Sequence, residues 1–467
     1  MTAVATLAPM TLGHRIRLKA PPPPGSEDVL TPAALAFVAE LDSAFAGRRC
    51  ELLVARCDRH ERVAAGWTPD FDPATAHIRD DPGWQVRPAF SSNGARRWRL
   101  DLEDSVSPTC SNLMHAQAEL LDASASSQTR DSGRAGSAEV VVRPRGWHMV
   151  DKCVLVDGRP VSAAILDFGL AVFHGAANQS ARVGLPQFCL PKLEGHLEAR
   201  LWNDVFVAAQ QMLGIPRGTI RATVLIETIF AAFEMEEILY ELREHADGLG
   251  AGYNDYLFSL VKTFGALGPD YVLPDRRSLT SDAPFLQAFA KLLDDTRRQR
   301  GAYGSTAFDA PEGKAPEPAP VRLAPARVPA RDLLSVARTA GHVSEQGVRD
   351  NVALALRYID AWLRGHGTVM VDGRTEDVSA AELARCQVWQ WMRYRTPTVE
   401  GTRVDREMVA RLIDEETAAL RHEPDTQAEA ARTVLEAVAM SPDLPPFLTT
   451  WAYSRRLVQS PTETHPC

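Results

Sequence analysis

The sequence predicts an α/β fold in which a parallel sheet forms a TIM-type (β/α)8 barrel, preceded by a helical segment and followed by an all-α domain. Between residues 98 and 305, short apolar or β-branched runs that end in a polar or charged residue alternate with helical stretches. The charged ends recur at intervals of 24, 25, 35 and 28 residues, at positions 143, 167, 192, 227 and 255. A barrel of this type uses about 31 residues for each strand–helix unit.

Composition limits the class of protein. The chain has 467 residues, of which 45% are hydrophobic, so it is long enough for two or three domains. Its net charge of −9 argues against nucleic acid or an anionic membrane as a partner. The most apolar stretch, residues 222–233, is shorter than the ~18 residues of a membrane span and contains Glu227. The first residues do not resemble a secretory signal, so we expect a cytoplasmic protein.

The seven cysteines are an odd number without a CxxC pair. This pattern favours reduced thiols over a disulfide framework or a zinc site.

The first 90 residues are predicted to form a helical segment ahead of the barrel. Apolar positions recur at helical spacing over residues 32–65, and Thr31 is suited to cap the helix. The low-complexity stretch 123–138 is predicted to be a flexible surface loop.

About seven strands can be recognised in the barrel region, residues 91–307, so an incomplete barrel is expected. An open doubly wound sheet remains the alternative, although no GxGxxG follows a strand. The predicted strands are residues 98–104, 139–143, 163–167, 187–192, 222–227, one near the glycine-rich turn 248–252, and one beginning at 301–304.

Six prolines fall within residues 308–331, which are predicted to form a semi-rigid linker. The C-terminal domain, residues 332–467, is predicted to be all-α. Its helices are expected at residues 332–338, 344–364, 379–393, 406–422 and 427–440.

Two carboxylates follow neighbouring predicted strands. Glu227 closes an apolar run, and Asp255 lies one unit later. At a barrel mouth the pair would suit Mg²⁺, which takes one or two protein carboxylates and leaves positions for substrate oxygens. An ion pair with an arginine or lysine is the alternative.

Other charged residues also follow predicted strands. Arg143 could stabilise an enolate or carboxylate, or form a salt bridge within the mouth. Asp101, Glu103 and Asp104 could orient metal-bound water, or simply decorate a helix N-terminus.

His148 could be a base, although a histidine beside Trp147 is more often structural. Lys192 could bind phosphate or solvate a loop.

Four long stretches resemble malate synthases of the shorter, A-type class. Among them are VVVRPRGWHMVDKCVLVDGRP and TEDVSAAELARCQVWQW. The resemblance extends over roughly residues 30 to 455, and the matching stretches are residues 140–160, 216–259, 273–289 and 375–391.

The resemblance implies a TIM barrel with an N-terminal helical clasp and a C-terminal helical plug. It implies an enzyme that condenses acetyl-CoA with Mg²⁺-bound glyoxylate to give malate and CoA. Glu227 and Asp255 match the metal ligands, and Arg143 matches the catalytic arginine. Asp377 matches the aspartate that takes the acetyl proton; without the resemblance it reads as a helix cap before Ser379.

We predict that four further residues bind the substrate, namely Gly252, Asn254, Glu103 and Asp104. A monomer is plausible.

The chain also departs from the family pattern. The segment that usually reads GLNxGxWDY has Gly250 in place of Asn and Asn254 in place of Trp. Compared with the family pattern, several dozen residues on the CoA side are missing after residue 305. The segment between residues 84 and 99 is also shorter than in the family. Two alternatives therefore stay open: a related Mg²⁺-dependent acyl-CoA enzyme that uses another 2-oxo acid, and a non-catalytic paralogue.

Overall fold

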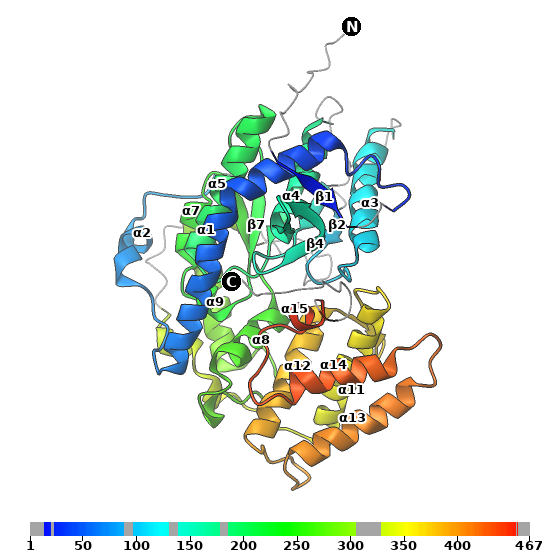
Figure 1. Cartoon of the computed structure of the whole chain (residues 1–467). Coiled ribbons are helices and arrows are strands. Elements are labelled where there is room, and N and C mark those ends of the chain that lie inside the picture. Colours follow the sequence, from blue (N-terminus) through cyan, green and yellow to red (C-terminus); the bar gives the residue numbers. More distant parts are fainter. Residues whose placement is uncertain are drawn as a thin grey trace.

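A parallel sheet at the centre of the larger lobe organises the chain in the computed structural model (Figure 1). The structure describes residues 14–19, 23–87, 97–129, 139–177, 185–304, 328–453 and 455. Within these residues the sheet has six strands in the order β2-β3-β6-β7-β8-β9. They are β2 (Arg97–Asp101), β3 (Glu139–Arg143), β6 (Gln187–Leu190), β7 (Ala222–Ile226), β8 (Ala246–Ala251) and β9 (Tyr303–Gly304).

The strand order decides between the two predicted sheet types. Every pairing in this sheet is parallel, and each strand lies beside the next parallel strand in the sequence. This is the winding of a barrel, whereas a doubly wound sheet reverses direction at a switch point. The described strands do not close the ring, because β2 and β9 are its unpaired ends.

The strand predicted at residues 163–167 is wrong. These residues begin helix α4 (Ala163–Ala177), in which every residue from Ala163 to Phe173 is buried. A short apolar run looks the same in a buried strand and in a buried helix, and only its length distinguishes them. An antiparallel sheet of β1 (Ile16–Leu18), β4 (Val150–Val156) and β5 (Arg159–Ser162) lies before it. The predicted intervals of 24 and 25 residues, which both used position 167, were therefore measured between a helix and a strand.

The glycine-rich segment is also different from its prediction. Gly248 and Gly250 lie inside strand β8, paired with Thr223 and Leu225 of β7. These glycines are therefore part of the strand and not of a turn. The chain leaves the strand at Gly252, which precedes helix α8.

The N-terminal helix α1 (Pro32–Ala64) forms as predicted, with the Thr31 hydroxyl accepting from the Ala34 amide at 3.2 Å. It packs against α4 and against α5 (His196–Leu213), and so spans the outside of the barrel (Figure 1). From this helix Arg56 donates to the Lys192 carbonyl at 2.8 Å. The clasp therefore supports the loop that follows β6.

Helix α3 (Cys110–Thr129) corrects two further predictions. It continues through residues 123–129, which were predicted as loop, while residues 130–138 lie outside the described part. Its first residue, Cys110, forms a disulfide with Cys153 of β4. The expectation that all cysteines are reduced thiols is therefore wrong.

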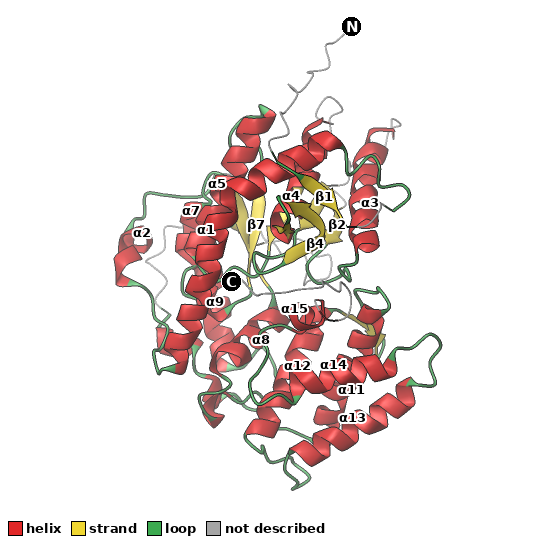
Figure 2. Cartoon of the chain, viewed as in Figure 1, coloured by secondary structure: helices red, strands yellow, loops and turns green. Residues whose placement is uncertain are grey.

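The C-terminal lobe is almost entirely helical, and Figure 2 shows the contrast with the strand-containing lobe. Its four long helices were all predicted within a few residues, and they enclose a hydrophobic core of their own. They are α11 (Glu345–Leu363), α12 (Val378–Arg393), α13 (Arg406–Leu420) and α14 (Ala428–Ala439).

Two features of this lobe differ from the prediction. A hairpin of β10 (Val369–Val371) and β11 (Arg374–Glu376) precedes α12. The helix predicted at 332–338 is a short α10 (Ala330–Leu333) and a 3-10 turn. The proline-rich linker lies outside the described residues, except for residues 328–331 at its end.

Helices α8 (Tyr253–Phe264) and α12 join the two lobes by packing against each other. No helix in the described part of the chain is long and apolar enough to cross a membrane. The remaining helical elements are Pro73–Thr75, α2 (Ala76–Asp80), α6 (Ile229–Ala232), α7 (Met235–Glu241), Pro269–Tyr271, α9 (Pro284–Arg300), Val336–Arg338 and α15 (Leu448–Ala452).

The disulfide predicts a measurable stabilisation. Because it joins residues 43 positions apart, Cys110→Ser should lower the free energy of unfolding by about 2–4 kcal/mol. Denaturant unfolding under non-reducing conditions measures this, with Cys57→Ser, at an exposed cysteine, as the control. An unchanged midpoint for Cys110→Ser would show that the disulfide does not stabilise the fold.

Candidate active site

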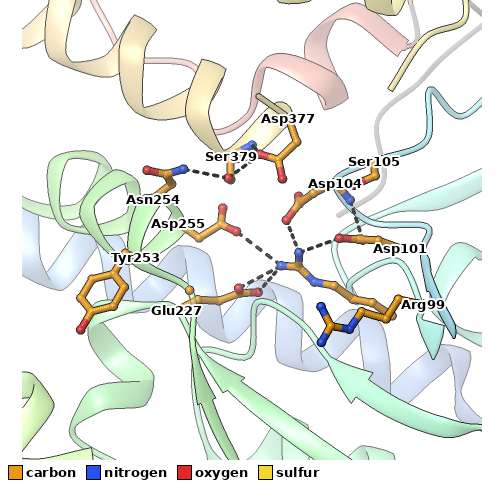
Figure 3. Close-up of a pocket in the computed structure, with 12 residues that line it drawn as sticks. Arg99, Asp101, Asp104, Ser105, Glu227, Tyr253, Asn254, Asp255, Asp377 and Ser379 are labelled. Atoms are coloured by element: carbon orange, nitrogen blue, oxygen red, sulfur yellow. Dashed lines mark hydrogen bonds and ion pairs between the residues drawn. The ribbon is translucent and has the colours of Figure 1, made fainter. Parts of the chain in front are cut away.

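An acidic cavity of about 280 Å³ opens where the carboxyl ends of the parallel strands meet the N-terminus of α12 (Figure 3). Chain reversal after each strand brings residues that are far apart in sequence to this edge of the sheet. The lining residues are Arg99, Asp101, Asp104, Ser105, Arg143, Glu227, Gly252, Tyr253, Asn254, Asp255, Asp377 and Ser379.

Arg143 lines the acidic cavity and pairs with several of its carboxylates. Its Nη2 donates to both Glu227 carboxylate oxygens at 3.0 and 2.9 Å and lies 3.4 Å from Asp255 Oδ2. Its Nη1 lies 3.2 Å from Asp101 Oδ2 and also pairs with Asp104. Burial disfavours the charge, but these carboxylates hold the pKa of Arg143 well above its ordinary value. The arginine is therefore a permanent positive charge in the site.

Lys192 provides a second buried cation that the sequence did not assign to the site. Its Nζ lies 2.5 Å from Asp104 Oδ1, 3.0 Å from Glu103 Oε1 and 3.4 Å from Asp255 Oδ1. Its backbone amide donates to Glu227 Oε1 at 2.7 Å, from a left-handed conformation with φ of 53°. Neither predicted role, phosphate binding or loop solvation, describes these contacts; Lys192 instead organises the carboxylates.

Carboxylates outnumber these two buried cations. Burial is the largest cause that raises the pKa of Glu227 to about 7 and the pKa of Asp101 to about 6. Burial and the neighbouring carboxylates also raise the pKa of Asp255 well above its ordinary value. Crowded, desolvated acids of this kind favour binding of a further cation.

Glu227 and Asp255 fit a hard divalent cation. Asp255 Oδ1 is buried and accepts no hydrogen bond from the described residues, although Lys192 Nζ lies 3.4 Å away as an ion pair. A Cβ on Gly252 would lie 2.4 Å from Glu227 Oε2, so glycine leaves room for this carboxylate. The described residues contain no group of three or more acidic, histidine or cysteine side chains arranged as a metal cage. Two carboxylates nevertheless suffice for Mg²⁺, which keeps several positions for water or substrate.

Asp377 has both of the positions predicted for it, as the cap of a helix and as a carboxylate of the site. It caps α12: its Oδ1 accepts from the Ser379 amide at 3.0 Å and from the Ser379 hydroxyl at 2.6 Å. It also lines the acidic cavity, on the side of α12 across from Glu227 (Figure 3). Burial, with the nearby Asp104 charge, raises the pKa of Asp377. The C-terminal lobe therefore contributes one carboxylate to a site whose other acids belong to the barrel.

Glu103 and His148 lie together behind Lys192. Glu103 Oε2 accepts from the Gly146 amide at 2.7 Å, and Glu103 does not line the acidic cavity. His148 stacks on Phe447 with ring centroids 4.3 Å apart. Burial lowers the pKa of His148 well below its ordinary value. These positions suit support of Lys192, and a substrate-binding role for Glu103 stays a prediction.

Comparisons with known proteins agree with this arrangement. Three family models match: malate synthase N-terminal domain at residues 15–77, malate synthase TIM barrel domain at 139–313 and malate synthase C-terminal at 342–456. A malate synthase of Streptomyces clavuligerus is 39% identical, over 93% of this chain and 97% of its own length. The chain belongs to the malate synthase family. The malate synthase of Myxococcus xanthus is 35% identical over 96% of this chain and 98% of its own length. The glyoxysomal malate synthase of Candida tropicalis is 34% identical over 94% of this chain and 95% of its own length.

Membership of the malate synthase family confirms the predicted barrel fold and the assignment as an enzyme. The alignment with the Streptomyces protein has 525 positions but includes only 93% of the 467 residues present here, so gaps in this chain fill many of those positions. This agrees with the predicted shortening of the chain.

Gly252 offers a direct test of the proposed cation site. In Gly252→Ala the new methyl group would collide with Glu227 Oε2, so affinity for a divalent cation should fall at least about tenfold. Titration calorimetry with Mg²⁺ measures the affinity. Gly47→Ala, on α1 where a Cβ meets no atom within 4 Å, is the matched control. Wild-type affinity in Gly252→Ala would place the cation away from Glu227.

Proposed function

We propose that this protein is a malate synthase that uses Mg²⁺ and condenses the acetyl group of acetyl-CoA with glyoxylate to give malate and CoA. The observation that carries the proposal is the position of Asp377. This carboxylate belongs to the C-terminal lobe, yet it lines the same cavity as Arg143 and the pair Glu227 and Asp255.

The first chemical step is removal of a proton from the acetyl methyl group. A thioester α-proton is weakly acidic, so its removal needs a positioned base and a positive charge near the enolate oxygen. Asp377 Oδ1 is engaged by the start of α12, which leaves Oδ2 to take the proton. Arg143 supplies the positive charge, because its carboxylate partners keep it protonated.

The second step is attack of the enolate carbon on the aldehyde of glyoxylate. When bound, Mg²⁺ would supply a Lewis acid that polarises the aldehyde and anchors the glyoxylate carboxylate. Glu227 and Asp255 would hold it, with Gly252 leaving the space for Glu227. Hydrolysis of the malyl thioester then releases CoA and makes the sequence effectively irreversible.

A larger cavity supports binding of acetyl-CoA. It has a volume of about 1020 Å³ and shares Tyr253 and Asn254 with the acidic cavity, so the two adjoin. Arg276, Arg277 and Arg374 line it. Arg276 pairs with Glu376, and Arg277 pairs with Asp350 and Asp372, so the phosphates of CoA would have to compete with these carboxylates for the two arginines. A long substrate in this cavity would reach the acidic cavity with its acetyl end. We also propose a cytoplasmic location, because the first residues do not resemble a secretory signal.

The proposed base predicts a large loss of turnover. Asp377→Asn should lower kcat by about 10²- to 10⁴-fold, because the amide cannot accept the acetyl proton. Free thiol release from acetyl-CoA with glyoxylate and Mg²⁺ is the measurement. Pyruvate and 2-oxobutyrate in place of glyoxylate test the alternative substrate class.

The outcomes separate the three functions. Thiol release with glyoxylate that Asp377→Asn abolishes supports a malate synthase, whereas release only with another 2-oxo acid contradicts it. Absence of release, together with no binding of CoA in calorimetry, would favour the non-catalytic paralogue.

Removal of the metal provides a second prediction. Treatment with EDTA should abolish thiol release, and added Mg²⁺ should restore it, because the aldehyde is then polarised again. Asp255→Asn should need at least about tenfold more Mg²⁺ for half-maximal recovery. Full activity in excess EDTA would contradict the assignment.

A further inference from the structure

Two polar side chains meet where α8 of the barrel faces α12 of the C-terminal lobe. The Asn254 side-chain amide donates from Nδ2 to Ser379 Oγ across a distance of 3.4 Å. Asn254 directly precedes Asp255 in the first turn of α8, and Ser379 follows Asp377 by two residues. Figure 3 shows Asn254, Ser379 and Asp377 connected in a line above Asp255.

The chemistry of the three groups fixes the direction of these hydrogen bonds. The nitrogen of a side-chain amide only donates, whereas a hydroxyl has a single proton to give. Because Asn254 donates to Ser379 Oγ, the hydroxyl proton is directed to Asp377 Oδ1, which lies 2.6 Å away. Ser379 is only 8% exposed, so little water competes for this proton.

This arrangement assigns different tasks to the two oxygens of Asp377. Oδ1 accepts from the Ser379 hydroxyl, from the Ser379 amide and, at 3.4 Å, from the Ala380 amide. With Oδ1 held by three donors, the carboxylate plane is fixed and Oδ2 is the oxygen available for a substrate proton. All three donors belong to the start of α12, and the other lobe reaches this group through the hydrogen bond from Asn254 to the Ser379 hydroxyl.

The position of Asn254 makes it suited to this task. It lines both the acidic cavity and the larger cavity that adjoins it. It lies on the same helix turn as Asp255. One turn of α8 therefore positions both the proposed metal ligand and the side chain that contacts Ser379. A small shift between the lobes would change the distance from Nδ2 to Ser379 Oγ.

We propose that Asn254 is a positioning residue for Asp377: through Ser379 it orients the base across the interface between the barrel and the C-terminal lobe. This inference rests on the proposed function, because it assumes that Asp377 removes the acetyl proton. It differs from the substrate-binding role predicted for Asn254, since the contact described here is to the protein.

The test is a double-mutant cycle of Asn254→Leu and Ser379→Ala. Leucine has nearly the size of asparagine but cannot donate a hydrogen bond. Each single variant should lower kcat by about 3- to 10-fold, the range of one neutral hydrogen bond. KM for acetyl-CoA and for glyoxylate should stay within about twofold of wild type, because substrate contacts remain. The double variant should be no slower than the slower single variant.

A second readout isolates proton removal. Exchange of the acetyl methyl protons of acetyl-CoA with D₂O reports the action of Asp377 without C–C bond formation, and it should slow by the same factors. Gln211→Leu, the same kind of replacement at an exposed position on α5, is the control and should leave both rates unchanged.

The results distinguish failure of this inference from failure of the proposed function. If kcat in the double variant falls by the product of the two single effects, Asn254 does not act through Ser379 and the inference is overturned. A rise in KM for glyoxylate with unchanged kcat in Asn254→Leu would also overturn it and restore the substrate-binding role. If the wild-type protein catalyses neither thiol release nor methyl exchange, both the proposed function and this inference fail.

Discussion

The arrangement of the site depends on the buried positive charge of Arg143. This single side chain contacts carboxylates from the ends of β2 and β7 and from the start of α8, namely Asp101, Glu227 and Asp255. Buried ion pairs add little to stability, but removal of one partner leaves uncompensated charge and costs about 3–5 kcal/mol. Arg143 therefore connects the strand ends to each other. Because its ion pairs add little to stability, a role in the chemistry of the site explains its presence better than a role in stability.

The surplus of carboxylates is the second constraint. Lys192 neutralises part of it from the loop after β6 and is supported from behind by Arg56 of α1. Acids that remain crowded after these contacts have raised pKa values, as Glu227 and Asp255 do. A bound divalent cation would relieve this repulsion. The N-terminal clasp and the acidic cavity are therefore parts of one electrostatic arrangement.

Much of this could be predicted from residues that follow short apolar runs. Arg143 and Glu227 were recognised because a charge directly after a buried strand needs a partner, and Asp255 because it lies one strand–helix unit after Glu227. The strand at 163–167 was wrong, because α4 is buried from residue 163 to residue 173 and its first five residues look like a strand. Asp377 could be found only through the resemblance, since its local pattern is that of a helix cap, which it also is. The roles of Ser379 and Lys192 were missed because only the fold brings Ser379 to the cavity and Lys192 to the carboxylates Asp104 and Asp255.

The proposed function depends on a divalent cation that Glu227 and Asp255 would hold beside Arg143, facing the base from the other lobe. A crystal structure of the protein with Mg²⁺ and glyoxylate would test it most directly. We expect the cation to be bound by these two carboxylates, with glyoxylate between it and Asp377. A cation bound elsewhere, or glyoxylate outside the cavity that Asp377 lines, would contradict it.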